Sequence, residues 1–401
     1  MTKPLPIFNQ VAPSASPAPQ GLPFLRLAFR PFYLGAALFS VVFVPLWVAI
    51  FLGAISWQPT PPALLWHAHE MLFGFAIAVI VGFLMTAGKS WTGLQTPRGP
   101  LLGLLITLWL SARVAALLAP STVFALLDLA LLPLVGLIFL RLLMRARNWR
   151  NVPLALILLL LALVNLTFHL SMNGLVDLTP MRSLYAGLAF IVIIECVMAG
   201  RVVPFFTASA IAGIKIEPVV WLERSTLAST ALGLALWVTG QNDTAAALGL
   251  ALAFAFNLAR QLRWHPLATR NRPILWILHL AYFWLTLGLG LLALAELGLA
   301  PVSAGVHALG VGATGGLIIG MMTRTARGHT GQVLTVGMPE RVAYVLVMIA
   351  AVLRVLLPLL LPSLSVFGLV AAATAWSTAF LLFLWQYTPW LMRSRADGKD
   401  G

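Results

Sequence analysis

The sequence predicts an all-α, polytopic membrane protein of about twelve transmembrane helices. Of its 401 residues, 61% are hydrophobic and only 9% are charged, and the mean hydropathy is +0.97. Soluble domains carry about 25% charged residues, so this composition indicates a bilayer protein. The formal net charge of +14 does not indicate nucleic-acid binding, because the basic residues stand in short loops between apolar runs. We therefore expect membrane lipid, and no nucleic acid, around this protein.

Twelve apolar runs approach the roughly 20 residues that a helix needs to cross a bilayer. Only residues 240–244 separate the seventh run from the eighth. Each run predicts one transmembrane helix, and the runs occupy about 31–55, 66–88, 100–118, 121–143, 152–171, 183–205, 223–239, 244–261, 274–296, 302–323, 340–360 and 365–388.

The basic residues indicate how these helices are oriented. If both termini are cytoplasmic, all but three of the 25 Lys and Arg residues fall on the cytoplasmic side, and the exceptions are Arg113, Arg182 and Arg354. Cytoplasmic loops of membrane proteins are enriched in Lys and Arg. Because removing one helix would scramble this segregation, the charges support the count of twelve independently of apolarity.

The chain divides into one membrane domain with two tails. Residues 1–25 are rich in proline and predict a flexible N-terminal tail, and residues 393–401 form a short polar C-terminal tail. Residues 26–392 form a single twelve-helix domain, in which we infer three four-helix repeats spanning 26–150, 151–272 and 273–392.

The first and third repeats match best. From His67 to Arg113 is 46 residues and from His307 to Arg354 is 47, and the middle repeat lacks both the histidine and the arginine. Each of these histidines lies at the outer end of a helix that runs inward, so we expect both at similar depth. Chance resemblance between two apolar segments is the alternative.

Three titratable side chains stand at the outer end of the second run, in the stretch Trp66-His67-Ala68-His69-Glu70. Such groups are costly in hydrocarbon and mark functional sites. Helical residues lie about 100° apart, so His67 and His69 point about 160° apart and cannot ligate one ion together. We expect one to face the bundle centre and the other a second site, with Glu70 orienting His67. A hydrogen-bonded core histidine is the alternative for each.

The tenth run supplies the partner for one of these histidines. His307 lies at a depth similar to that of His67 and His69, which predicts a metal centre between the two helices, most simply haem. Arg113 and Arg354 share this depth and could hold haem propionates, because guanidinium binds carboxylates in a bidentate manner. The alternative for both arginines is snorkelling to the outer headgroups. His169 is the best third imidazole for an outer-side metal.

Two further features leave alternatives open. Gly312, Gly316 and Gly320 form a stripe of small residues, which either lets helices approach closely or gives a macrocycle a flat wall. Glu195 lies in the middle of the sixth run, where a carboxylate indicates a proton path or an ion site, or else a neutral, hydrogen-bonded acid. The only cysteine, Cys196, is either a soft copper ligand or a buried inert thiol.

Several stretches together resemble one family, the NnrS proteins, over almost the whole chain. Ser90 departs from the asparagine expected before Trp91, which puts any role of that position in doubt. The stretches are Phe29-Arg30-Pro31-Phe32, Trp66-His67-Ala68-His69-Glu70-Met71-Leu72-Phe73-Gly74-Phe75, Trp91-Thr92-Gly93, Gly200-Arg201-Val202-Val203-Pro204-Phe205-Phe206-Thr207, Met322-Thr323-Arg324 and Gly328-His329-Thr330-Gly331.

The resemblance implies a twelve-helix protein of the bacterial inner membrane that contains haem b and copper and is linked to nitric oxide, denitrification and nitrosative stress. Combined with the residues, it predicts a haem site bridging the second and tenth helices. His307 and either His67 or His69 would be the axial ligands, and the other helix-two histidine with His169 would form a second, copper site.

This protein would then bind or turn over nitric oxide near the outer face. The alternatives are a transporter of a metal or a metal–nitrosyl complex, or an accessory or assembly partner of a nitric oxide reductase. The sequence assigns no catalytic residue and leaves open whether the protein is an enzyme and which electron donor it would use.

Overall fold

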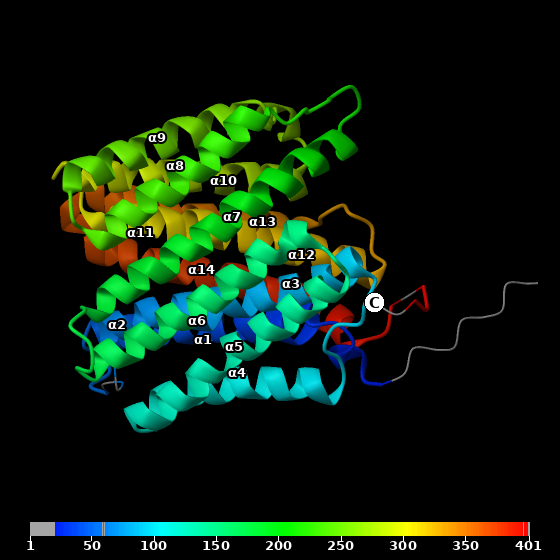
Figure 1. Cartoon of the computed structure of the whole chain (residues 1–401), viewed down its shortest axis with the longest axis horizontal. Helices are drawn as coiled ribbons and strands as arrows, with labels where there is room; N and C mark the ends of the chain where they lie inside the picture. The colour runs from blue at the N-terminus through cyan, green and yellow to red at the C-terminus, as the bar shows by residue number, and fades with distance from the viewer. Residues whose placement is uncertain (1–20, 58, 60, 396, 400–401) are drawn as a thin grey trace, which may run out of the picture.

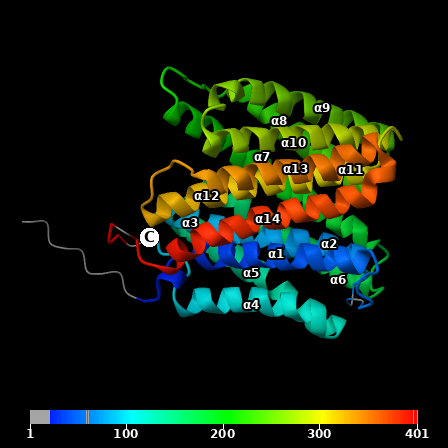
Figure 2. The same ribbon diagram turned by 180° about the vertical axis from the view of Figure 1, so that it is seen from behind.

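The computed structural model describes residues 21–57, 59, 61–395 and 397–399, and in this part of the chain it contains helices and no strand. The helices run alongside one another as a single bundle (Figures 1 and 2). The predicted all-α fold is therefore confirmed.

Twelve long helices run through the described residues, close to the twelve apolar runs. Two of them contain a π-helical segment between two α-helical parts. In chain order the elements are α1 (Phe29–Phe51), the span α2 (Ala63–His69), η2 (Glu70–Ala76) and α3 (Ile77–Thr92), then α4 (Pro100–Leu118), α5 (Ser121–Arg145), α6 (Val152–Met172), α7 (Pro180–Ala210), α8 (Val220–Thr239), α9 (Asp243–Leu262), α10 (Pro273–Glu296), the span α11 (Val302–His307), η5 (Ala308–Gly315) and α12 (Gly316–Thr330), and finally α13 (Met338–Leu360) and α14 (Ser365–Met392).

Eleven of these spans are long and apolar enough to cross a membrane, which makes the chain a multi-pass membrane protein. The exception, α8, is 20 residues long but carries Glu223 and Arg224 near its start. The short loop that separates α8 from α9 is a true helix break. Gly240 ends α8 in the left-handed region with φ of 58°, and the Asn242 side chain caps α9 by accepting from the Ala245 amide at 2.9 Å.

The order of the helices in space gives the bundle two edges and two ends. The α8–α9 pair lies at one edge and α4 at the opposite edge, while α1 packs against α14 and α9 against α10 (Figures 1 and 2). The short helices α2 and α11 lie at the same end, away from the C-terminal residues (Figure 1). We call this the outer end, following the charge segregation of the sequence.

The described parts of the two predicted tails are docked on the bundle. Residues 1–20 lie outside the described residues, but Pro23–Leu25 form a 3₁₀ helix instead of continuing a tail. Arg30 on α1 donates to the carbonyl oxygens of Leu391 at 2.9 Å and Arg393 at 2.7 Å. Arg395 donates to the His329 carbonyl at 3.1 Å. Unsatisfied carbonyls at a helix end attract such donors, which explains the docking.

Both π segments follow the outer-end histidines. η2 begins at Glu70, directly after His69, and η5 begins at Ala308, directly after His307. The corresponding helix of the middle repeat, α7, is α-helical from Pro180 to Ala210. A π segment shifts the register of the residues around it and often occurs at functional sites. The two histidine-bearing helices therefore share a local distortion that α7 lacks.

Candidate metal and cofactor sites

His67 and His69 serve two different sites on opposite sides of α2, as the helical spacing requires. His67 lines a cavity of about 270 Å³ at the outer end, whereas His69 belongs to a fully buried group of polar side chains. We call these the outer cavity and the polar cluster.

The outer cavity brings together the two imidazoles that the sequence suggested would meet. His67 from α2, His307 from α11 and Arg354 from α13 all line it. The rest of its wall is mostly apolar and comes from α1, α2, η2, α7, α11, η5, α13 and α14, including Trp47, Met71, Phe75, Leu188, Gly310, Val311, Thr314 and Trp376. Two histidines from facing helices on one apolar cavity are a suitable setting for a metal cofactor.

The two histidines of the outer cavity are held differently. His307 Nδ1 donates to the Ser303 carbonyl at 2.7 Å, so Nε2 is left as its free nitrogen. A hydrogen bond of this kind fixes the tautomer and raises the basicity of a metal-binding histidine. The His67 ring stacks on Trp47 with 3.8 Å between ring centroids, but its buried Nδ1 has no hydrogen-bond partner among the described residues. His307 is thus the better prepared ligand, and His67 lacks the supporting bond.

Arg354 gives the outer cavity a positive charge. Its guanidinium forms no hydrogen bond or ion pair with a described residue, and no described residue lining the cavity is a carboxylate. A cation in an apolar cavity without an anionic partner calls for an anionic ligand or solvent. The cavity therefore suits an apolar molecule that carries a carboxylate.

The structure resolves the alternatives for the glycine stripe. A Cβ added at Gly312, Gly316 or Gly320 would press against α10, so the stripe lets the η5–α12 span approach α10 closely. Gly310 differs, because it lines the outer cavity and an added Cβ would meet nothing within 4 Å. The open wall predicted for a macrocycle is therefore at Gly310 and not along the stripe.

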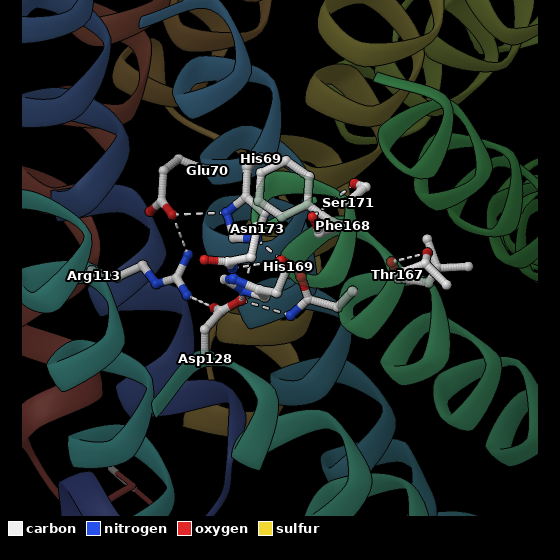
Figure 3. A network of polar contacts seen from close by, with 11 residues as sticks. His69, Glu70, Arg113, Asp128, Thr167, Phe168, His169, Ser171 and Asn173 are labelled. Carbon is white, nitrogen blue, oxygen red and sulfur yellow. Dashed lines mark hydrogen bonds and ion pairs between the residues drawn. The ribbon is translucent and has the colours of Figure 1, made fainter. Parts of the chain in front are cut away.

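The polar cluster is built where α2 and η2 meet α4, α5 and α6 (Figure 3). Its six members are each no more than 5% exposed. His69 Nδ1 lies 3.0 Å from Glu70 Oε1, and Arg113 donates to the same oxygen at 2.6 Å and also to Asp128. The members are His69, Glu70, Arg113, Asp128, Asn165 and His169.

Three members of the polar cluster have the arrangement of a metal-ligand set. Asp128 Oδ2 lies 3.2 Å from His69 Nε2 and 3.0 Å from His169 Nε2, and one ligand atom from each of the three residues lies within 4.8 Å of the others. Ligands about 2.0 Å from a tetrahedral metal are about 3.3 Å apart, so these separations are close to those of a metal site. Glu70 would orient His69 from behind, as a carboxylate does for many metal-bound histidines.

The polar cluster offers more acceptors and more negative charge than its own hydrogens satisfy. The His69 ring is surrounded by three oxygen acceptors, because Nδ1 faces Glu70 while Nε2 faces Asp128 and the Asn165 Oδ1 at 3.0 Å. A neutral imidazole has only one N–H. Two carboxylates and one guanidinium leave a net charge of −1, and buried net charge is costly. A metal ion between Nε2 and Asp128, or a second proton on His69, would resolve both problems.

The structure changes the expected partners of Arg113 and Glu70. Arg113 does not join Arg354 at the outer cavity, since it is paired with Glu70 and Asp128 in the polar cluster. Glu70 contacts His69, not His67. The physical reason is Asp128, which we did not single out and which draws the guanidinium toward α5. As a lone carboxylate inside the 121–143 run, Asp128 could have been identified by the same criterion as Glu195.

Glu195 and Cys196 lie next to each other in sequence but face different surroundings. Glu195 lines a separate cavity of about 80 Å³, and its Oε2 has no hydrogen-bond partner among the described residues. Cys196 is buried against Arg260, whose Nη2 lies 3.0 Å from Sγ, and near Asn257 and Tyr282. The contacts of Cys196 thus lie in a polar network of α7, α9 and α10 and include no histidine.

These features define a multi-pass membrane protein with two histidine sites on opposite sides of one helix near its outer end. A family model described as "NnrS protein" matches residues 23–395, which is nearly the whole chain. The chain therefore belongs to the NnrS family, whose members are linked to the response to nitric oxide. A search of curated proteins found none that matches it.

Proposed function

We propose that this protein binds haem b in the outer cavity and binds nitric oxide there, as a protein of the bacterial inner membrane. The observation that carries the proposal is the convergence of His67, His307 and Arg354 on one apolar cavity that has no carboxylate among its described lining residues. Nitric oxide is a small apolar gas, so it can reach such a cavity from the bilayer.

The residues of the outer cavity match the needs of haem one by one. The macrocycle is apolar, and so is most of the wall, with open space at Gly310. The iron needs an imidazole nitrogen, which His307 Nε2 offers while Nδ1 is held by Ser303. The propionates need a cation, which Arg354 supplies. The volume of about 270 Å³ lies just below the range of about 300–1,000 Å³ for small-molecule sites.

The difference between the two histidines supports a division of roles. When bound, haem would supply the iron at which nitric oxide binds. His307 would remain the permanent ligand, because its supporting hydrogen bond favours coordination. His67, whose Nδ1 lacks such a bond, would be the weaker of the two ligands and the one that nitric oxide would replace.

We further propose that the polar cluster holds copper between His69, Asp128 and His169. Imidazole nitrogens are good copper ligands, and the net charge of −1 would be neutralised by a monovalent ion. The competing arrangement is a doubly protonated His69 with no metal. The two differ in metal content, because only copper binding makes the metal-to-protein ratio depend on His169.

The test is to purify the protein and record its optical spectrum and metal content. We expect a haem absorption band that is lost in His307→Ala and kept in His169→Ala, and a copper content that shows the opposite dependence. A purified protein without a haem band, or a His307→Ala variant with a full complement of haem, would reject the haem site. Copper that is retained in both His169→Ala and Asp128→Asn would reject the second site.

A further inference from the structure

A second cavity continues the outer cavity toward the other end of the bundle. This inner cavity, of about 80 Å³, is lined by four of the spans that also line the outer cavity, namely α1, α2–α3, α7 and α11–α12, and by α10. On α7 the outer cavity is lined by Leu184 and Leu188 and the inner cavity by Glu195 and Met198. On the tenth span the outer cavity reaches Thr314 and the inner cavity begins at Leu317. The two cavities therefore follow one another along the same helices.

Glu195 and Thr314 lie at the boundary between the two cavities. Glu195 lines the inner cavity and Thr314 lines the outer one, and α7 packs against η5 where they meet. Glu195 is only 9% exposed, and its Oε2 and the Thr314 Oγ1 are both buried without a hydrogen-bond partner at bonding geometry. The two side chains are nevertheless close enough to interact. Unsatisfied buried polar atoms are rare and call for an explanation.

The described lining of the inner cavity is mostly apolar, and its polar groups are the Glu195 carboxyl and the Tyr33 hydroxyl. Its only titratable residue besides Glu195 among those described is Tyr33, whose buried hydroxyl has no partner at bonding geometry and which lies near Thr325 on α12. The titratable groups that line the outer cavity are His67, Tyr185, His307 and Arg354. A water needs roughly 10–15 Å³ and at least two polar partners, so the cavity of about 80 Å³ can hold water where the Tyr33 hydroxyl and the Glu195 carboxyl supply those partners.

We propose that Glu195 passes protons from the inner cavity to the outer cavity, so that protons consumed in the outer cavity come from the cytoplasmic side. This rests on the proposed function in taking the outer cavity as the place of proton consumption. A buried carboxyl without a cationic partner is most stable as the neutral acid, so it holds a proton that it can give.

The transfer has two balanced steps. The Glu195 carboxyl donates its proton to the Thr314 hydroxyl oxygen, while the hydroxyl gives its own proton to an acceptor in the outer cavity. The resulting carboxylate then takes a proton from water in the inner cavity, this water regains a proton from the cytoplasmic side, and the Tyr33 hydroxyl hydrogen-bonds it. The alternative is a neutral glutamic acid that has only a packing role and exchanges its proton with neither cavity.

The experiment uses the full chain in detergent and follows the infrared C=O stretching band of the protonated carboxyl after mixing with D₂O. We expect a band that vanishes in Glu195→Gln, persists in Glu195→Asp, and shifts as the carboxyl takes up deuterium. Filling the inner cavity with Ala199→Leu should slow the shift at least about tenfold. Val202→Leu is a second filling variant in case the first does not fold, and both residues line the cavity.

Thr314→Val is the matched test of the outer step, because valine keeps the shape of threonine and loses the hydroxyl. It should leave deuterium exchange of the carboxyl band unchanged and slow proton delivery to the outer cavity by roughly 10²-fold, the usual contribution of a positioned proton-transfer group. Delivery is read from the proton uptake that accompanies reduction of the haem-loaded protein.

Four results would overturn the proposal. One is exchange at equal rates in the wild type and in both filled variants, and another is an unchanged carboxyl band in Glu195→Gln. The third is unchanged exchange in Thr314→Val together with unchanged proton uptake. The fourth is copper uptake into proteoliposomes that Glu195→Gln abolishes while proton uptake persists. If the purified protein binds no haem, the proposed function fails, but the exchange of the carboxyl band still decides whether Glu195 exchanges its proton through the inner cavity.

Discussion

Asp128→Asn is the sharpest perturbation that the polar cluster offers. Asp128 contacts Arg113, His69, His169 and Asn165, and all five residues are buried. The substitution keeps the shape of the side chain and removes one negative charge. Without metal the net charge of the cluster would rise from −1 to 0, so a bound monovalent cation would leave an uncompensated positive charge. The variant should therefore lose its copper.

The expected loss of unfolding free energy depends on the partner that Asp128 leaves behind, which is Arg113. Breaking a buried ion pair by removing one partner costs about 3–5 kcal/mol. Arg113 keeps Glu70 at 2.6 Å and the cluster becomes neutral, so no buried charge is left unpaired, and we expect instead the loss of hydrogen bonds to a charged group, about 1–3 kcal/mol of unfolding free energy. Copper affinity should fall by more than about 100-fold, since even residues behind the ligands contribute 10–100-fold.

The assay combines copper-to-protein ratio with reversible unfolding in detergent. Asp177→Asn is the matched control, because Asp177 is exposed in the loop after α6 and should change stability by less than about 0.5 kcal/mol. If Asp128→Asn binds copper as well as the wild type and unfolds within the error of Asp177→Asn, the reasoning about the polar cluster is wrong.

Three further predictions concern the outer cavity and its helices. His67→Ala should keep haem and bind nitric oxide faster than the wild type in stopped-flow measurements, and a slower rate would contradict the division of roles between the histidines. Arg354→Gln should weaken haem binding by about 1–3 kcal/mol in titrations of the apoprotein, while Arg354→Lys should restore part of it. Gly310→Ala should unfold like the wild type, whereas Gly316→Ala should destabilise the protein by about 1–3 kcal/mol, because its Cβ would press on Ala281 and Met348.

The helices and the opposite directions of His67 and His69 could be predicted from the sequence, because both follow from local rules. Apolar length and basic loops define the spans, and a spacing of two residues in a helix separates two side chains by a fixed angle. The separation of α8 from α9 was also visible in the chain, since Gly240 and Asn242 are typical of a helix end and a helix start.

The partners of Arg113 and Glu70 could not be predicted in the same way. They depend on how α4 and α5 pack against η2, which brings Asp128 to the guanidinium from another helix. The repeat suggested that Arg113 and Arg354 would have equivalent roles, but equal spacing in the chain does not fix equal surroundings. The π segments also have no clear sequence signal, although they affect where the side chains after each histidine point.

The hydrogen bonds from Arg30 to the carbonyls at the end of α14 have a consequence for biogenesis. The ribosome makes α1 first and α14 last, yet this guanidinium on the first span is fully buried against the carbonyl oxygens of Leu391 and Arg393. The contact between α1 and the end of α14 therefore forms only when synthesis ends. Until then these two hydrogen bonds of Arg30 are missing, and a chain that stops before Leu391 would never offer it these acceptors.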